Sequence, residues 1–400
     1  MPGRRASAIF FSNYFLLYAS FAILTPYLPL YLKARGFSPS RIGLLLGIVE
    51  LAGLAGPLLV SRLADARGSY RGLLVGSLLA SAVAFASMQL TTALLAAAAL
   101  AAAVGFCYRS VTPLLDSSVS RSLPDPARQY GRFRVAGSVG FVVVSLVLQV
   151  GGVVSGDSSW SILAAFCASA LLAAAAACFL PPVPRAAAAH PAHLSAGKAP
   201  AFDRGFWAVI GIIFLGRFGM GAYYSFFSLY LRDTFGGASQ SPPGGGVSLM
   251  WAIGSMAEIA PMWFSGRLVA RWGLRPVLLV SLLAISVRLS LFVLAPSLLL
   301  VGVAQLLHAF TFGTFHPAAV AYINARVPAE RRGLGMAIYN AVGIGLASFT
   351  ASLAGGYIVE TRGYVTLFLL YALVPLGGAA LLFTKAGRAG IFDPWKPRPF

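Results

Sequence analysis

The sequence predicts an all-α membrane protein whose twelve transmembrane helices form two pseudo-symmetric six-helix bundles. Composition is the first indication, because 58% of the 400 residues are hydrophobic and only 10% are charged, whereas a soluble domain carries about 25% charged residues. The second is the length of the apolar stretches, near the roughly 20 residues that cross a hydrocarbon core. The third is an internal repeat. Because backbone polar groups in lipid must bond within their own segment, the spans are expected to be helices.

The apolar stretches place twelve spans along the chain. We expect them at residues 8–33, 41–63, 72–90, 92–116, 132–152, 159–180, 205–232, 247–270, 275–295, 298–323, 334–358 and 364–385. The first six fall in an N-terminal bundle of residues 1–180, and the last six in a C-terminal bundle of residues 205–386. The Pro- and Ala-rich segment 181–204 is typical of a flexible cytoplasmic linker, and residues 387–400 form a cytoplasmic tail.

The basic residues of the loops predict the orientation. With the N-terminus in the cytoplasm, most of the 30 lysines and arginines fall in cytoplasmic segments. The loops on the other side hold only Lys33, Arg35, Arg41, Arg232 and Arg362. Under the positive-inside rule this asymmetry predicts a multi-pass protein of the plasma membrane, a bacterial inner membrane, with both termini cytoplasmic. The net charge of +19 thus reflects the loops, and without a compact basic domain we expect no nucleic-acid partner.

Several classes of function are disfavoured by what the sequence lacks. The three cysteines fall inside apolar spans and show neither metal nor disulfide spacing. The pair Gly197-Lys198 is followed by Ala199 instead of the Ser or Thr of a phosphate-binding loop. No set of paired metal ligands or Ser/His constellation indicates an enzyme. We therefore expect no cofactor, no metal and no enzymatic activity.

A repeated loop indicates that the two halves are related. The segment Ser61–Arg71, between the second and third spans, is echoed by Gly266–Arg275 between the eighth and ninth. Its acidic residue lies at a helix end where it can meet arginines or a neighbouring helix N-terminus, and its glycine permits a tight turn. Such contacts could latch two conformations; the alternative is a generic basic loop at the membrane edge. The latch candidates are Asp65, Gly68, Arg71, Gly266, Arg271 and Gly273.

This loop resembles the signature Gly-x-Leu-x-Asp-Arg-x-Gly-x-Arg-Arg of the major facilitator superfamily, and the resemblance covers nearly the whole chain. Three positions depart from the signature: Ser61 replaces the first glycine, Ala66 the first arginine, and Ala270 the acid of the second copy. The resemblance implies a secondary transporter of two homologous bundles, with a solute site at their interface and alternating access.

Charged residues inside the spans are the candidate functional residues, because such groups are costly in lipid and usually functional. Five stand out by position: Glu50, Asp116, Arg217, Glu258 and Arg288. Spacing adds two more, because Arg109 shares a helical face with Asp116, and Arg134, just inside the next span, is placed to pair with Asp116.

The stretch from Asp116 through Arg134 to Gly140 resembles the same region of the lactose permease and of the related 3-phenylpropionate transporters. In the sugar carrier the matching acid and arginine bind substrate. The resemblance therefore implies that Asp116 and Arg134 contact the solute. The alternative is a structural ion pair that holds the fourth and fifth spans together.

The resemblance continues in the second half, where spans 8 to 10 are similar to those of the 3-phenylpropionate transporters, notably over Gln305–Phe312. Against the lactose permease, Arg288 and His308 match its coupling arginine and histidine. Ser255 and Thr311 stand where that permease carries carboxylates. Proton coupling is implied, but by another route.

Glu258 is the preferred proton carrier, because a buried carboxylate beside an arginine can change its protonation when the arginine moves. Glu50 is the alternative carrier. A static salt bridge between Glu258 and Arg288 is the competing interpretation, and His308 could equally be a satisfied core histidine. His316, which precedes a proline, is interpreted as structural.

Aromatic and polar residues of two spans could line a pocket. The candidates are Tyr14, Tyr18 and Phe21 in the first span and Arg217, Gly221, Tyr224 and Ser228 in the seventh. Packing is the alternative, because aromatic residues at helical spacing more often serve the core. The guanidinium groups of Arg109, Arg134 and Arg217 favour an anionic solute, since guanidinium pairs well with carboxylate.

Together these features predict a proton-coupled symporter of a small organic solute that works by alternating access. An aromatic or organic acid is favoured, and a sugar or nucleoside is a further candidate. A drug-type proton antiporter is the first alternative, although the fifth span lacks the Gly-Pro motif usual in such exporters. A transport-inactive receptor or scaffold is the alternative of another class. The expected partners are the solute, protons and the lipid bilayer, and the chain is expected to be monomeric.

Overall fold

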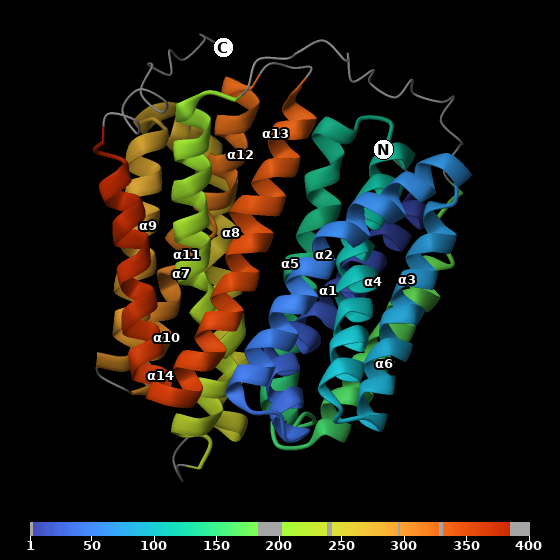
Figure 1. Ribbon diagram of the computed structural model, residues 1–400. Helices are drawn as coiled ribbons and strands as arrows, with labels where there is room; N and C mark the ends of the chain where they lie inside the picture. The colour runs from blue at the N-terminus through green and yellow to red at the C-terminus, as the bar shows by residue number, and fades with distance from the viewer. Residues whose placement is uncertain (1–2, 183–201, 238–241, 295–296, 328–330, 385–400) are drawn as a thin grey trace. The chain divides into compact units, whose positions relative to one another are not determined.

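The structure is a computed structural model. It describes residues 3–182, 202–237, 242–294, 297–327 and 331–384 (Figure 1). Within these ranges the regular structure is helical and contains no strand. The all-α prediction is therefore confirmed for the part of the chain that the structure describes. The predicted linker, residues 181–204, lies largely outside these ranges, and the predicted tail, residues 387–400, lies wholly outside them.

The first six long helices, coloured from blue to green in Figure 1, follow the predicted spans closely. They are α1 (Arg4–Ala34), α2 (Pro39–Arg67), α3 (Tyr70–Ser87), α4 (Leu94–Ser122), α5 (Pro126–Gly151) and α6 (Ser159–Ala177). A short 3-10 turn, η1 (Met88–Leu90), follows α3. α2 packs against α4, α1 packs against α5 and α6, and α3 packs against α4 and α6.

The second half contains more helical segments than predicted, because two of its predicted spans are interrupted. The elements are α7 (Arg204–Phe235), η2 (Pro243–Gly246), α8 (Val247–Trp272), α9 (Leu274–Leu294), α10 (Leu298–Leu306), α11 (His308–Thr311), α12 (Phe315–Arg326), α13 (Arg332–Ile338), the π-helix η4 (Tyr339–Leu346) and α14 (Ala347–Leu381). α9 lies at the centre of this group and packs against α14 and against the segments α10 to α12. Its buried face, with Leu278 and Leu282, joins Phe315 in an apolar core.

The chain divides into two compact units, one formed by Met1–His190 with Phe227–Ala252 and the other by Pro191–Phe226 with Ile253–Phe400. Several polar contacts attach Phe227–Ala252 to the first six helices. Arg232 pairs with Asp157, which precedes α6, and the Tyr27 and Ser248 hydroxyls share a 2.6 Å hydrogen bond. The predicted domain boundaries at residues 180 and 205 stay a prediction.

Ten helical segments among the described residues are long and apolar enough to cross a membrane. One of them, Arg332–Leu381, has 50 residues and, at about 1.5 Å per residue, exceeds twice a hydrocarbon core of roughly 30 Å. It is broken at Gly363, whose φ of 78° and ψ of 177° are not helical, between the two spans predicted there. α8, with 26 residues, is not among the ten. The membrane fold is confirmed, and the count of twelve stays a prediction.

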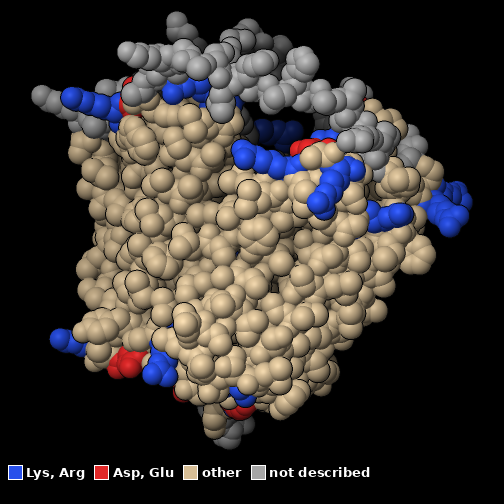
Figure 2. Space-filling model, turned by 45° about the vertical axis from the view of Figure 1, so that its right-hand side comes forward, with Lys and Arg blue, Asp and Glu red and all other residues tan. Residues whose placement is uncertain are grey.

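Charged side chains lie at the ends of the helices on the face shown in Figure 2, with a broad band of uncharged residues between them. Many large apolar side chains are exposed along the helices, including Leu95, Leu172 and Leu299. An exposed apolar patch of such an extent marks contact with another apolar medium. The bilayer is that medium for a chain of this hydropathy.

Close packing of α2 on α4 depends on glycines, as at many helix interfaces in membranes. A Cβ at Gly56 would lie 2.0 Å from the carbonyl oxygen of Phe106, and one at Gly105 would lie 2.3 Å from the carbonyl oxygen of Val49. These are backbone atoms, which cannot rotate away. The two helices therefore approach each other as closely as they do only because these positions carry no side chain.

Replacing Gly56 with alanine is expected to destabilise the protein by about 1–3 kcal/mol, the usual cost of overpacking a core. The matched control is Gly76→Ala in α3, because a Cβ at Gly76 meets no atom within 4 Å. Thermal unfolding of the purified proteins in detergent measures the stability of both variants. Equal melting temperatures for Gly56→Ala and the control would contradict the packing argument.

Candidate functional site

Asp116 is held by tyrosines from two other helices. It lies on α4, and the Tyr14 hydroxyl of α1 donates a 2.8 Å hydrogen bond to its carboxylate. Tyr130 of α5 also interacts electrostatically with this carboxylate. The Tyr14 side chain is fully buried, with no exposed surface. Three helices thus meet at one carboxylate inside the first unit.

Arg134 lies on α5 and interacts with Tyr18 of α1. Its guanidinium donates to the Tyr18 hydroxyl, and its central carbon lies 4.2 Å from the centre of the Tyr18 ring. Gly137, one turn later, makes room for this contact, since a Cβ there would lie 2.7 Å from the Tyr18 ring. Arg134 also acts electrostatically on Asp116. Within the described residues no ion pair joins Asp116 and Arg134; each is instead bonded to a tyrosine of α1.

Glu50 and Arg109 form an ion pair between α2 and α4. The sequence placed Arg109 on the face of Asp116, and the structure gives it Glu50 as its partner. The charges of both residues are therefore compensated within the first unit. The Arg109 side chain lies along the close packing of these helices, since a Cβ at Gly53 would lie 2.6 Å from its Cγ.

A broken helix marks the corresponding region of the second unit. The predicted span 298–323 is divided into α10, α11 and α12, with interruptions at Leu307 and at Phe312–Thr314. Pro317 accounts for the second interruption, because its ring cannot donate to, and clashes with, the carbonyl four residues earlier. Discontinuous helices of this kind form the substrate and ion sites of many secondary transporters.

Arg288 of α9 is fully buried against the broken helix. Its guanidinium donates to the Gln305 side chain, lies 2.8 Å from His308 Nδ1 and donates to the Thr311 hydroxyl at 3.3 Å. Its central carbon also lies 4.0 Å from the centre of the Tyr223 ring. A buried cation is thus surrounded by neutral polar groups.

His308 connects Arg288 to Glu258 of α8. An arginine can only donate, so His308 Nδ1 accepts, and a neutral imidazole then carries its proton on Nε2. His308 Nε2 lies 3.5 Å from a Glu258 carboxylate oxygen. The Glu258 side chain is 21% exposed and that of His308 6%. The sequence predicted these residues as a group, and the structure arranges them as a chain with the carboxylate at its more exposed end.

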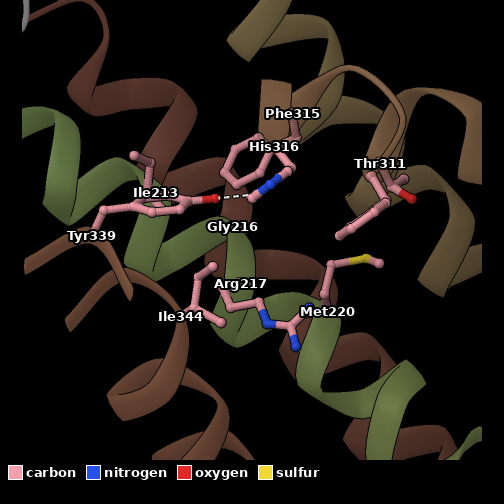
Figure 3. Close-up of a pocket in the computed structure, with 10 residues that line it drawn as sticks. Ile213, Gly216, Arg217, Met220, Thr311, Phe315, His316, Tyr339 and Ile344 are labelled. Carbon is pink, nitrogen blue, oxygen red and sulfur yellow. Dashed lines mark hydrogen bonds between the residues drawn. The ribbon is translucent and has the colours of Figure 1, made fainter. Parts of the chain in front are cut away.

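Arg217 of α7 faces a pocket beside this chain (Figure 3). It donates to the Ser348 hydroxyl of α14 at 2.9 Å, and its central carbon lies 4.3 Å from the centre of the Tyr224 ring. Gly221 allows this approach of α7 to α14, because a Cβ there would lie 2.4 Å from that of Ala351. The predicted face of span 7 therefore serves helix packing at Gly221 and pocket lining at Arg217.

The pocket contains about 350 Å³ of empty space, open solvent included. It is lined by Ile213, Gly216, Arg217, Met220, Thr311, Phe312, Phe315, His316, Tyr339 and Ile344. Tyr339 begins the π-helix, an irregularity often found at functional sites, and its hydroxyl shares a hydrogen bond with His316 Nδ1. The sequence assigned His316 a structural role and did not single out Tyr339. The proline after His316 is the signal from which a break in this helix could have been predicted.

The first copy of the repeated loop is tightly bonded. Asp65 accepts from Tyr70 and forms a 2.7 Å ion pair with Arg121 of α4. Gly68 ends α2 in the left-handed region, with φ of 64°. Arg71 donates to the carbonyl of Leu180, near the end of α6, at 3.3 Å. Asp65 is thus held by Arg121, which lies outside the repeated loop.

The second copy shows the same turn without the acid. Gly273, between α8 and α9, has φ of 80°, and Arg271 is exposed. Gly266 lies within α8. The tight glycine turn is therefore common to both copies, and the acidic contact belongs to the first.

Comparisons with known proteins agree with this architecture. The model of the MFS_1 like family matches residues 9–370. A maltose permease of Geobacillus stearothermophilus is 27% identical over 94% of this chain and 93% of its own length. The "Probable 3-phenylpropionic acid transporter" of Escherichia coli strain K12 is 28% identical over 91% and 94%.

Solved structures give the same fold. A mutant form of the nucleoside transporter NupG superposes with a TM-score of 0.82 at 16% identity, over 95% of this chain and all of that one. A bacterial homologue of the human lysosomal transporter Spinster superposes with a TM-score of 0.72 at 15% identity, over the whole of both chains. The chain is therefore a membrane transporter of the MFS_1 like family, within the major facilitator superfamily.

Proposed function

We propose that the chain is a proton-coupled symporter of a small organic acid. The observation that carries this proposal is the chain of contacts from Arg288 through His308 to Glu258, set against a broken helix. Glu258 is the proton-accepting group at its more exposed end. Protonation removes the negative charge that His308 Nε2–H faces, and this weakens a charge-assisted contact. A proton can thereby alter how Arg288 is held.

The charges of the second unit favour an acid as the solute. Arg217 and Arg288 are both inside spans there, and Glu258 is the carboxylate that faces this cluster. Two arginines and one carboxylate leave one positive charge of this cluster without a counter-charge. Buried charges are stable only when they are compensated. An anionic solute supplies the missing charge. The relative named for 3-phenylpropionic acid points to the same class of compound.

A sugar is the second candidate, because another relative is named a maltose permease. A nucleoside is the third candidate, because one sequence relative and the solved NupG structure are named for nucleoside transport. Neutral sugars require several hydroxyl partners, whereas most of the pocket residues around Arg217 are apolar. The pocket is therefore better suited to an acid with an apolar body than to a sugar.

The test is uptake by the purified protein in liposomes with an imposed inside-alkaline pH gradient. We expect radiolabelled 3-phenylpropionate to accumulate above its equilibrium level, and a protonophore to abolish the accumulation. Protein-free liposomes are the control, and unlabelled maltose and uridine are the competitors. Accumulation of maltose instead would favour the sugar. Accumulation driven only by the reversed gradient would establish the antiport alternative.

We further propose that the chain acts as a monomer in a bacterial inner membrane, with both termini in the cytoplasm. The excess of arginine in the loops on one side supports this orientation. In intact cells, a cysteine-free variant carrying Ala34→Cys is expected to react with an impermeant maleimide, and one carrying Ser69→Cys is expected not to react. Both positions are exposed in the folded chain. The reverse pattern of labelling would overturn the orientation.

A further inference from the structure

We propose that Arg217, His316 and Tyr339 form the subsite that binds the carboxylate of the solute, within the pocket of the second unit. This inference rests on the proposed function, because it assumes that the transported solute is an acid. It assigns the anion to one pocket and names the groups that hold it. Neither His316 nor Tyr339 was expected to take part from the sequence.

The first argument is the charge of Arg217. Its contacts are a hydrogen bond to Ser348 and an interaction with Tyr224, both neutral side chains. Among the residues that the structure describes, no carboxylate forms an ion pair with it. A guanidinium has five N–H donors in a planar fork, so donors remain for a ligand. A cation inside a span is expensive unless it is paired, and a carboxylate fits its fork.

The second argument is the pair formed by His316 and Tyr339. One hydrogen bond joins His316 Nδ1 to the Tyr339 hydroxyl. If the hydroxyl donates, His316 Nε2 carries the remaining proton; if the ring donates, the hydroxyl proton is left over. In both arrangements of the neutral pair one donor remains for a ligand. Arg217 is close enough to act electrostatically on both residues.

The third argument is the rest of the lining. Besides the polar groups, the pocket is bounded by Met220, Phe312, Phe315 and two isoleucines (Figure 3). Methionine and phenylalanine side chains pack well against an aromatic ring. The ligand class is therefore a monocarboxylate with an aromatic or other apolar body.

Thr311 joins this subsite to the chain of contacts that ends at Glu258. Its side chain lines the pocket, and its hydroxyl lies 2.9 Å from His308 Nδ1 and accepts from Arg288 at 3.3 Å. An anion at Arg217 is thus separated from Glu258, the proton carrier, by the side chains of Thr311 and His308. Solute and proton can therefore influence each other without a long structural path.

Equilibrium binding at fixed pH tests the subsite. The probes are 3-phenylpropionate, benzoate and the neutral amide 3-phenylpropionamide, measured by calorimetry on the purified full-length protein. We expect the wild type to prefer the acids. Arg217→Gln is expected to weaken acid binding on the order of 100-fold while leaving the amide unchanged. Tyr339→Phe is expected to weaken it about tenfold, and Arg217→Lys should retain part of the affinity.

The control is Arg41→Gln, which removes an exposed arginine at the start of α2 and is expected to bind as the wild type does. Each variant is first checked by its melting temperature, and Arg217→Lys serves where Arg217→Gln does not fold. Equal acid affinity in wild type and Arg217→Gln, or a wild type that binds neither acid, would overturn the subsite. Because binding needs no gradient, loss of gradient-driven uptake in the wild type would reject symport while leaving an Arg217-dependent affinity standing.

Discussion

Replacing Glu258 with glutamine is expected to abolish the accumulation of solute driven by a pH gradient. Glutamine keeps the shape of the side chain that lies 3.5 Å from His308 Nε2 in the wild type, but it cannot bind and release a proton. The step that requires deprotonation is removed, whereas the movement of loaded protein is not. Solute exchange across the membrane at equal pH should therefore persist in Glu258→Gln liposomes preloaded with unlabelled compound.

The matched control for this experiment is Glu50→Gln. Glu50 was the alternative proton carrier, but it pairs with Arg109, whose side chain is 41% exposed, at the packing of α2 on α4. Glu50 and Arg109 belong to the first unit, whereas the contacts from Arg288 to Glu258 lie in the second, so the loss of this pair leaves those contacts unchanged. We expect Glu50→Gln to retain accumulation. If it loses accumulation and Glu258→Gln keeps it, the assignment of the proton carrier is reversed.

Neutralising Asp116 or Arg134 alone is expected to destabilise the protein, and neutralising both is expected to restore part of the loss. Each side chain is half-buried and bonded to a tyrosine of α1. Asp116→Asn leaves Arg134 without its counter-charge, and Arg134→Gln does the same to Asp116. Each single variant should lose about 1–3 kcal/mol, the penalty for leaving a polar partner unsatisfied in the interior. The double variant removes both charges, so neither one is left without its counter-charge.

Thermal unfolding of the wild type, the two single variants and the double variant gives the interaction energy between Asp116 and Arg134, because the effects of coupled residues are not additive. The experiment separates the two interpretations that the sequence left open. Destabilisation that is partly relieved in the double variant identifies a structural pair. Unchanged melting temperatures together with lost binding of 3-phenylpropionate would instead identify a direct solute contact. Strict additivity of the two losses would show that these charges do not depend on each other.

The transmembrane helices were predictable because hydropathy acts locally. The predicted spans 159–180 and 275–295 correspond to α6 and α9 within about three residues, the margin expected for such boundaries. The interruption of span 10 was not predicted, since a break inside an apolar stretch leaves hydropathy unchanged. The π-helix likewise has no compositional signal. The broken helix packs against α9, and Gly343 of the π-helix approaches Ile213 of α7, so both irregularities lie where segments distant in the sequence meet.

The candidate site was predictable as a set of residues and not as a set of contacts. Intramembrane charge identified Glu258, Arg288 and Arg217, because such residues are rare and costly. Their partners come from distant segments: Tyr14 and Asp116 are 102 positions apart, and Arg217 and Ser348 are 131 apart. Helical spacing relates residues on one helix only. Helical spacing therefore associated Arg109 with Asp116 of the same helix. In the structure Arg109 forms its ion pair with Glu50 of the neighbouring helix α2.

The proline that follows His316 has a consequence for how this region responds to mutagenesis. Pro317 has no N–H, so the carbonyl oxygen of Gly313 loses its usual helical donor. Main-chain acceptors survive every side-chain replacement, and one that stands in a broken helix can still attract a hydrated cation or a water molecule. Alanine scanning across α11 and α12 will consequently miss a contribution that belongs to the peptide backbone itself.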